Sequence, residues 1–251
     1  RAMREYQGSE QCRMRFLRTQ LDDPGARDCG RCDNCGGVKL SSDVGDEAVS
    51  AARSALGRPG VPLDPRRMWP TAMPGLGIDI RGKLPAAEQA EVGRVIARFT
   101  DLGFGPQLRS LLTGDVDAPL PDDVIKACVQ VLAAWDWAQR PAAIVHIGSR
   151  RRPALIADLA SRLAAIGRLT DLGSVPHVGR SSAGRSNSAL RLRDVWDAYE
   201  LPDSVAAQLS GQPVLLVDDL VDTGWTLTVV ARLLRRAGAG PVYPFALALA
   251  A

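Results

Sequence analysis

The sequence predicts three domains of different class along its 251 residues. They are a small cysteine-rich module at residues 1–40, a helical or winged-helix-like connector at 41–119, and an α/β domain with a doubly wound parallel sheet at 120–251. Two observations decide this division: four closely spaced cysteines near the start, and an apolar strand near the end that runs into two carboxylates. Between them, glycine and proline interrupt short helical stretches.

The first module is defined by Cys12, Cys29, Cys32 and Cys35, with the spacing C-x16-C-x2-C-x2-C. Two-residue gaps place successive thiolates on one tight turn, and the longer arm can bring the remaining sulfur round to complete a tetrahedron. The spacing therefore predicts one structural zinc ion, because four cysteine ligands leave no position for water. Disulfides or free thiols are the alternative. They fit less well, because a fifth cysteine makes the count odd and no signal peptide is recognised.

The residues around these cysteines resemble the zinc-binding module of RecQ-family DNA helicases. The resemblance rests on YQGSEQCR at residues 6–13 and DCGRCDNC at residues 28–35, and it covers about residues 3–37. It implies DNA as a partner and a position directly after the second motor lobe of an ATP-driven helicase. Because the sequence has no G-x-x-x-x-G-K-[ST] loop for ATP phosphates, helicase activity is expected to belong to a longer parent protein.

Arginines after the first cysteine are candidate contacts for DNA phosphates. Arg13, Arg15 and Arg18 lie on a predicted helix, with at least the last two on one face. A solvated helix face paired with local carboxylates is an equal alternative, and the net charge of +3 is too small to decide between them. No apolar run approaches the roughly 20 residues needed to span a bilayer, so no membrane partner is expected and a cytoplasmic, nucleoid-associated location is predicted.

The connector is predicted from a weaker pattern. Helices are expected at residues 46–56, 65–68, 88–102 and 106–112, with a strand and turn at 75–84. The third helix is best defined, because five apolar residues recur at helical spacing: Val92, Val95, Ile96, Phe99 and Leu102. A winged helix commonly follows the zinc module in RecQ-family proteins, and a small helical connector is the equal alternative.

The second strong motif is VLLVDDLVDTGWT at residues 214–226. Its four leading apolar residues predict a central parallel strand at 214–217 that is buried on both faces. Ligands of such sheets bind beyond the carboxyl ends of the strands, where Asp218 and Asp219 follow. Backbone N–H groups of residues 223–226, at the start of a predicted helix, can hold a phosphate dianion.

This motif resembles the PRPP-binding motif of type I phosphoribosyltransferases. The resemblance implies that Asp218 and Asp219 hold the ribose hydroxyls of PRPP, with magnesium bridging ribose and pyrophosphate. The 5′-phosphate would lie on the loop that contains Asp222, Thr223, Gly224, Trp225 and Thr226. Solvated or helix-capping carboxylates are the alternative, which the thirteen-residue context disfavours. The sequence assigns no catalytic residue.

Upstream segments support the same fold. The expected elements are a helix with apolar positions over 124–132, a strand at 143–147, and helices at 153–166 and 226–237 before a last strand at 242–249. This alternation predicts a doubly wound sheet. Cys128 and His146 are expected to pack in its core, while the role of His177 stays open.

Two loops complete the expected phosphate site. GSRRRP at residues 148–153 occupies the place of the family's pyrophosphate loop, which makes Ser149 and Arg150 candidate phosphate ligands. Residues 178–193 correspond to the flexible loop that closes over PRPP, and 190–196 have apolar positions to dock on the sheet. The chain departs from the family in three ways: no hood domain is recognisable, the first loop carries three arginines, and Trp225 is bulky.

Two functions of different class follow. The favoured one is the DNA-binding and regulatory C-terminal region of a RecQ-like helicase, as in actinobacterial proteins fused to a phosphoribosyltransferase-type domain, with roles in DNA unwinding, repair and recombination. The alternative is an active Mg-PRPP-dependent phosphoribosyltransferase tethered to the helicase. A third hypothesis is capture of a DNA end phosphate by the same loop.

Overall fold

The computed structural model describes residues 2–37, 43–56, 58–179 and 187–250. The chain divides into two compact units, Arg1–Ala52 and Arg53–Ala251. This division differs from the three domains that the sequence predicts, because there is no boundary near residue 120. Within the described residues, no helix is both long and apolar enough to cross a membrane.

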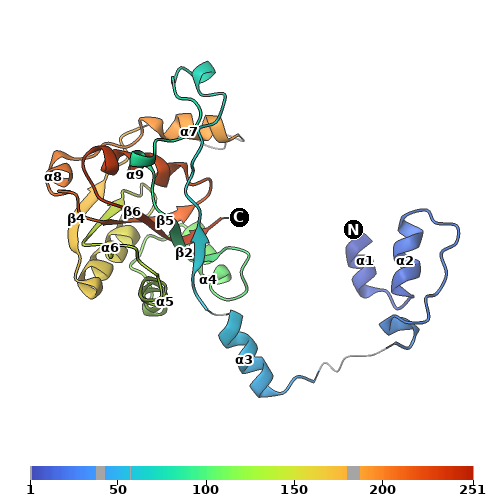
Figure 1. Ribbon diagram of the computed structural model, residues 1–251. Coiled ribbons are helices and arrows are strands. Elements are labelled where there is room, and N and C mark those ends of the chain that lie inside the picture. The colour runs from blue at the N-terminus through green and yellow to red at the C-terminus, as the bar shows by residue number, and fades with distance from the viewer. Residues whose placement is uncertain (1, 38–42, 57, 180–186, 251) are drawn as a thin grey trace. The chain divides into compact units, whose positions relative to one another are not determined.

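The first unit is built from short elements with very little core. It contains α1 (Ala2–Gly8), α2 (Arg13–Gln20), the 3-10 turn η1 (Asp33–Cys35) and most of α3 (Asp46–Leu56) (Figure 1). Tyr6 and Phe16 pack edge to face, with ring centroids 5.7 Å apart. Cys12 is the only fully buried residue among residues 2–37. So little burial cannot hold a fold of this size, and a metal ion or crosslink is needed.

The second unit combines a six-stranded sheet with helices on both faces. Its strands are β1 (Val61–Leu63), β2 (Gly93–Arg98), β3 (Ala143–Ile147), β4 (Thr170–Val175), β5 (Val214–Val221) and β6 (Val242–Leu249). Its helices and 3-10 turns are η2 (Pro74–Leu76), η3 (Ala86–Glu88), α4 (Gly105–Thr113), α5 (Asp122–Ala133), α6 (Pro153–Gly167), α7 (Ser188–Trp196), α8 (Asp203–Ala206) and α9 (Trp225–Arg236).

The strand order is β1-β2-β6-β5-β3-β4. All neighbouring pairs are parallel except β1 with β2, which pair antiparallel at the edge. A mixed α/β sheet is therefore confirmed, with one antiparallel edge strand that the sequence did not predict.

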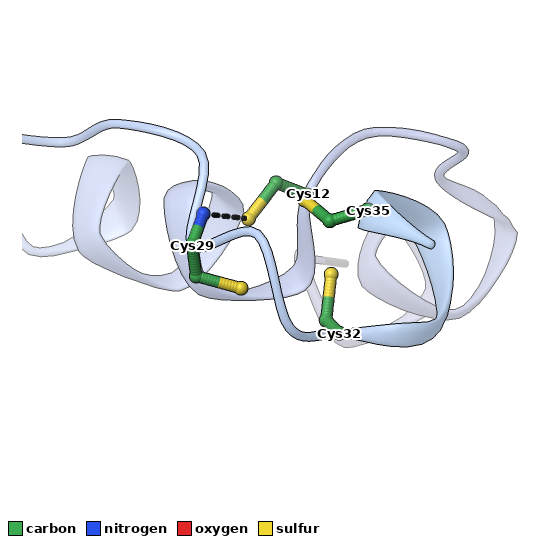
Figure 2. A group of neighbouring side chains, drawn as sticks. All are labelled: Cys12, Cys29, Cys32 and Cys35. Atoms are coloured by element: carbon green, nitrogen blue, oxygen red, sulfur yellow. Dashed lines mark hydrogen bonds between the residues drawn. The ribbon is translucent and has the colours of Figure 1, made fainter. Parts of the chain in front are cut away.

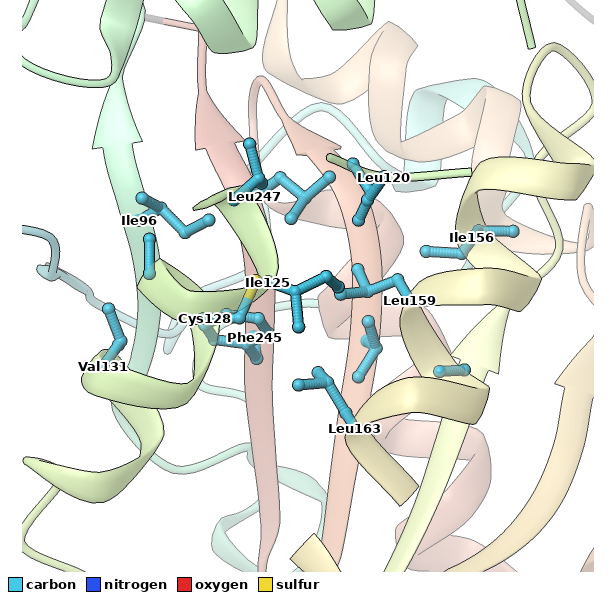
Figure 3. Close-up of a cluster of buried hydrophobic side chains, with 14 of the residues drawn as sticks. Ile96, Leu120, Ile125, Cys128, Val131, Ile156, Leu159, Leu163, Phe245 and Leu247 are labelled. Carbon is cyan, nitrogen blue, oxygen red and sulfur yellow. The ribbon is translucent and has the colours of Figure 1, made fainter. Parts of the chain in front are cut away.

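Helices cover both faces of the sheet, as a doubly wound fold requires. α4, α5 and α6 pack on one face and α8 and α9 on the other (Figure 1). Figure 3 shows the first face, where Ile125 and Cys128 of α5 and Leu159 of α6 meet Phe245 of β6. Cys128 is fully buried, as predicted, and burial raises the pKa of its thiol. His146 is only partly buried, and its Nδ1 has no hydrogen-bond partner among the described residues.

A third apolar cluster caps α9 at the end of the sheet where the carboxylates lie. Trp225 and Val229 of α9 pack there against α7 and the segment at residues 64–89, called the cap segment below. The remaining buried members are Trp69, Met73, Leu84, Ala189 and Leu192. The helix at 190–196 thus docks on α9 rather than on the sheet, and the chain has a small cap although the sequence showed no hood.

The connector region contains the largest errors of prediction. Residues 88–102 hold the strand β2 rather than a helix, and β2 pairs with β6 inside the main sheet. Residues 65–68 and 75–84 form no regular helix or strand, apart from η2 and an isolated bridge between Met68 and Lys83. The helices at 46–56 and 106–112 are confirmed as α3 and α4.

Candidate functional site

The sheet has a switch point between β3 and β5. From β3 the chain passes through α6 to β4, and from β5 it passes through α9 to β6 on the other side. α6 and α9 cover opposite faces, so their connections part at the carboxyl ends of these two strands. Open α/β sheets bind ligands in the crevice at this point. β3 pairs with β5 as far as His146–Val217, and Asp218 and Asp219 lie just beyond.

Asp219 is joined to the loop that follows β3. The Ser149 hydroxyl lies 3.1 Å from Oδ2 of Asp219, to which it donates, and it accepts the Arg152 backbone N–H at 3.0 Å. Two of the predicted phosphate-site residues, 70 positions apart in the sequence, are therefore in contact. The hydroxyl orients one carboxylate at the mouth of the crevice.

Asp218 lies deeper in the same place. It is 7% exposed, and Oδ1 accepts the backbone N–H of Asp219 at 2.9 Å. Burial raises the pKa of Asp218 well above its ordinary value, and the neighbouring Asp219 charge raises it further. Tyr199 lies against this pair: burial and the Asp218 charge raise the pKa of its phenol to about 12, against a hydrogen bond with Thr226 that lowers it. Carboxylate oxygens are the ligands that Mg²⁺ prefers, so the donor set fits this cation.

The phosphate loop, residues 222–226, follows β5 and leads into α9. Gly224 caps the helix with φ 77° and ψ 2°, a left-handed conformation that favours glycine. α9 is 12 residues long, so its first N–H groups and its dipole favour an anion at this end. Trp225 does not lie on the open side of the loop. Its indole is 3% exposed within the cap, and Nε1 donates to the Ser188 hydroxyl at 2.8 Å.

Two arginines from outside the sequence motif touch the phosphate loop. Arg66 of the cap segment donates to the Thr223 carbonyl oxygen from Nε at 2.9 Å and from Nη2 at 2.7 Å. Arg191 of α7 forms an ion pair with Asp222. No sequence signal links either arginine to the loop, because both contacts depend on tertiary packing over 157 and 31 positions.

The three consecutive arginines after β3 have different surroundings. Arg152 is 5% exposed and donates to the carbonyl oxygens of Leu111 and Gly114, at 3.1 and 2.7 Å, at the end of α4. Arg150 is exposed and donates to the Gly179 carbonyl at 3.3 Å, and Arg151 is also exposed. Arg152 is thus a structural tie, while Arg150 keeps the exposure that a phosphate ligand needs.

Of the flexible loop predicted at residues 178–193, residues 180–186 lie outside the described part of the chain, whereas residues 188–193 form the start of α7 rather than a loop. His177, before these residues, forms an isolated antiparallel β-bridge with Tyr199, which follows them. The two rings pack edge to face, with centroids 5.0 Å apart. His177 Nδ1 is buried and has no hydrogen-bond partner among the described residues. His177 therefore packs behind Tyr199 and supports its ring.

The predicted zinc ligands come together in the first unit. Cys12, Cys29, Cys32 and Cys35 have sulfur atoms within 4.8 Å of one another, and Figure 2 shows these side chains converging. The backbone N–H groups of Arg15 and Cys29 donate to the Cys12 sulfur at 3.4 and 3.2 Å.

These hydrogen bonds bear on the charge of the cluster. The Arg15 N–H, with that of Cys29, lowers the pKa of Cys12 to about 6, although burial opposes this. The Gly30 N–H lowers the pKa of Cys35, but burial and the neighbouring Cys12 and Cys32 raise it to about 12. Four thiolates so close together need a cation among them, so the donor set fits a closed, structural zinc site.

The three arginines of α2 are paired with carboxylates of the same unit. Arg13 pairs with Asp33 at 3.2 Å, Arg15 with Asp28 at 3.3 Å, and Arg18 with Asp23 at 2.6 Å. Pairing with local carboxylates is the alternative to DNA contact that the sequence leaves open. Any phosphate that reached these arginines would have to compete with the local carboxylates.

Comparisons with known proteins support the second unit alone. Residues 154–243 match the family model of the phosphoribosyl transferase domain. A solved purine phosphoribosyltransferase from Pyrococcus horikoshii OT3 is similar at 20% identity, covering 53% of this chain and 77% of that one, with a TM-score of 0.33. No curated protein matches the chain. The chain thus contains a phosphoribosyltransferase-like domain.

Proposed function

We propose that the second unit binds PRPP with magnesium at the switch point between β3 and β5. The observation that carries this proposal is the Ser149–Asp219 contact, which joins the loop after β3 to the carboxylate pair beside the phosphate loop. The family model covers most of these elements, from α6 through α9. Asp218 and Asp219 would face the ribose hydroxyls, and the N–H groups of residues 223–226 would hold the 5′-phosphate.

The chain's own residues would act mainly by orientation and charge. Ser149 fixes one carboxylate of the pair, and Tyr199 closes the space behind the other. Arg150 is placed to neutralise a departing pyrophosphate from the loop after β3. When bound, magnesium would supply positive charge to the diphosphate oxygens as the bond to ribose breaks.

Calorimetric titration of PRPP with magnesium into the chain tests this proposal. Saturable binding is expected, and Asp219→Asn should weaken it at least about tenfold, because the pair loses one of its charges. Asp203→Asn, at the exposed start of α8, is the matched control. Absence of PRPP binding to a folded chain would refute the proposal. If PRPP binds, an assay of pyrophosphate release with nucleobases and amines as acceptors would distinguish a transferase from a binding domain.

The four-cysteine cluster favours a second function, in which the first unit braces a DNA-facing part of a RecQ-type helicase. Its support is the sequence resemblance around residues 6–13 and 28–35 together with the convergence of the four sulfur atoms. If this proposal is correct, the zinc-loaded chain binds DNA with a salt dependence that is reduced when Arg15 is replaced. Equal affinity for DNA with and without Arg15, or no DNA binding, would contradict it. Preference for a 5′-phosphorylated strand would instead indicate end capture by the phosphate loop.

A further inference from the structure

The cap segment is hydrogen-bonded to the backbone of the phosphate loop through Arg66. Arg66 lies 157 positions before Thr223 and outside the residues that match the family model. Two of its guanidinium nitrogens converge on one acceptor, the Thr223 carbonyl oxygen, at 2.9 and 2.7 Å. Hydrogen bonds from a charged donor are among the stronger polar contacts, and arginine presents its donors in a rigid fork.

This contact fixes the direction of a neighbouring donor. The Thr223 carbonyl and the Gly224 N–H belong to one planar trans peptide group, so they point in opposite directions. Gly224 has φ 77°, and glycine permits the rotations by which such a peptide would turn over. With the carbonyl held by Arg66, the Gly224 N–H is directed to the other side of the peptide plane. A cation at the oxygen also polarises the peptide and strengthens its N–H as a donor.

Arg66 is itself held in place by the cap. Its guanidinium lies 5.3 Å from the Trp225 ring centroid, within the range of a cation–π contact. The Trp225 ring stacks on Trp69 with centroids 6.1 Å apart and an interplanar angle of 18°, and its Nε1 donates to Ser188. The bulky residue in the phosphate loop is therefore the platform on which the arginine rests.

We propose that Arg66 is a positioning residue that locks the Thr223–Gly224 peptide, so that the Gly224 N–H faces the bound phosphate. Through this contact the cap segment sets the affinity of the loop for a phosphate monoester dianion. The inference rests on the proposed function, because it concerns the same phosphate loop. It assigns a role to a residue that makes no contact with the ligand itself.

Titration of ribose 5-phosphate into the full chain tests this role. Arg66→Ala should weaken binding about tenfold, and Arg66→Lys about threefold, because lysine keeps the charge but loses the fork. Methylguanidinium in the buffer should restore part of the affinity of Arg66→Ala. The matched control is Arg81→Ala in the same segment, where the exposed arginine pairs with Asp79 at 3.6 Å, and this variant should bind as the wild type does. Unchanged affinity in both Arg66 variants would overturn the proposal.

A second readout needs no ligand. In free protein, the amide ¹⁵N and ¹H resonances of Gly224 should shift in Arg66→Ala and Arg66→Lys but stay in place in Arg81→Ala. If wild-type chain fails to bind ribose 5-phosphate, the proposed function fails, while the Gly224 resonance still reports on the peptide lock. If the resonance does not move in either Arg66 variant, the lock is refuted, whatever the chain binds. Should Arg66→Ala not fold, Arg66→Lys carries both measurements.

Discussion

Replacing Arg152 tests whether a buried cation holds the loop after β3. Its guanidinium is 5% exposed and bonds to two carbonyl oxygens at the end of α4. Each hydrogen bond from a charged donor contributes about 1.5–3 kcal/mol, and the desolvation of the guanidinium offsets part of the sum. We therefore expect Arg152→Ala to lower the free energy of unfolding by about 3 kcal/mol. For a unit of about 200 residues this corresponds to a Tm about 6–12 °C lower.

Urea unfolding followed by tryptophan fluorescence measures this loss in the second unit alone, because all five tryptophans lie between residues 69 and 225. Arg151→Ala, at the exposed neighbouring position, should change stability by less than about 0.5 kcal/mol. PRPP affinity should also fall in Arg152→Ala. The variant keeps the backbone N–H that Ser149 accepts, but it loses the side chain that holds this part of the loop in place. A loss below about 0.5 kcal/mol in Arg152→Ala would show that the guanidinium contributes nothing net, and would refute the reasoning.

Three further changes have expected outcomes. Asp218→Asn should raise the free energy of unfolding at pH 8 by about 0.5–2 kcal/mol in urea titrations, and this gain should disappear below about pH 4. The same difference in stability between variant and wild type at both pH values would contradict a raised pKa of Asp218. Cys32→Ser should remove most of the zinc measured by mass spectrometry, while Cys128→Ala should keep one ion per chain; equal zinc in both would exclude the four-cysteine site. Gly93→Ala should cost about 1–3 kcal/mol in urea unfolding, because the new Cβ would lie 2.6 Å from a carbonyl oxygen of β6, whereas Gly75→Ala meets no atom within 4 Å and should be neutral.

The sequence predicts β6, β5 and β3, the neighbouring strands in the middle of the sheet, because these strands carry a local signal. The runs at residues 143–147 and 214–217 are apolar apart from His146, since helices cover both faces of the sheet, and they are confirmed as β3 and the first half of β5. β5 extends past the carboxylates to Val221 because β6 continues to pair with it there. The pairing partner that lengthens β5 is distant in the sequence, so local apolarity underestimates the strand.

β2 was mistaken for a helix because it too is buried on both faces. Val95 packs on the side of α9 and Ile96 on the side of α5, so apolar residues follow one another without the alternation with polar residues that is typical of a half-buried strand. The outer members of the supposed helical stripe are exposed, with Leu102 at 78%. The edge strand β1 is only three residues long and contains a proline, and the edge strand β4 has mostly polar or exposed residues, so neither carries a local strand signal.

The residues of the candidate sites also differ in whether a local sequence pattern marks them. The four cysteines and the carboxylate pair are compact motifs, so their spacing alone indicates where ligands would bind. Arg66, Arg191 and Tyr199 reach the phosphate loop or the carboxylate pair from outside the motif, and nothing in their local sequence marks them. The same limit applies to Arg152, which stands beside a candidate phosphate ligand in the sequence but turns inward to α4.

The buried charge of Asp218 connects stability with the proposed function. Because burial raises its pKa in the folded chain, the unfolded chain gives up its proton first as the pH rises from about 4. The group therefore contributes stability below the unfolded pKa, and this contribution is lost as the pH rises through the folded pKa. Among the described residues no arginine or lysine forms an ion pair with Asp218, so ionisation of this carboxyl group in the folded chain is unfavourable. A divalent cation with PRPP would remove this penalty, so magnesium and PRPP together should stabilise the wild type more than Asp218→Asn. Equal stabilisation of the two chains would mean that Asp218 does not face the ligand.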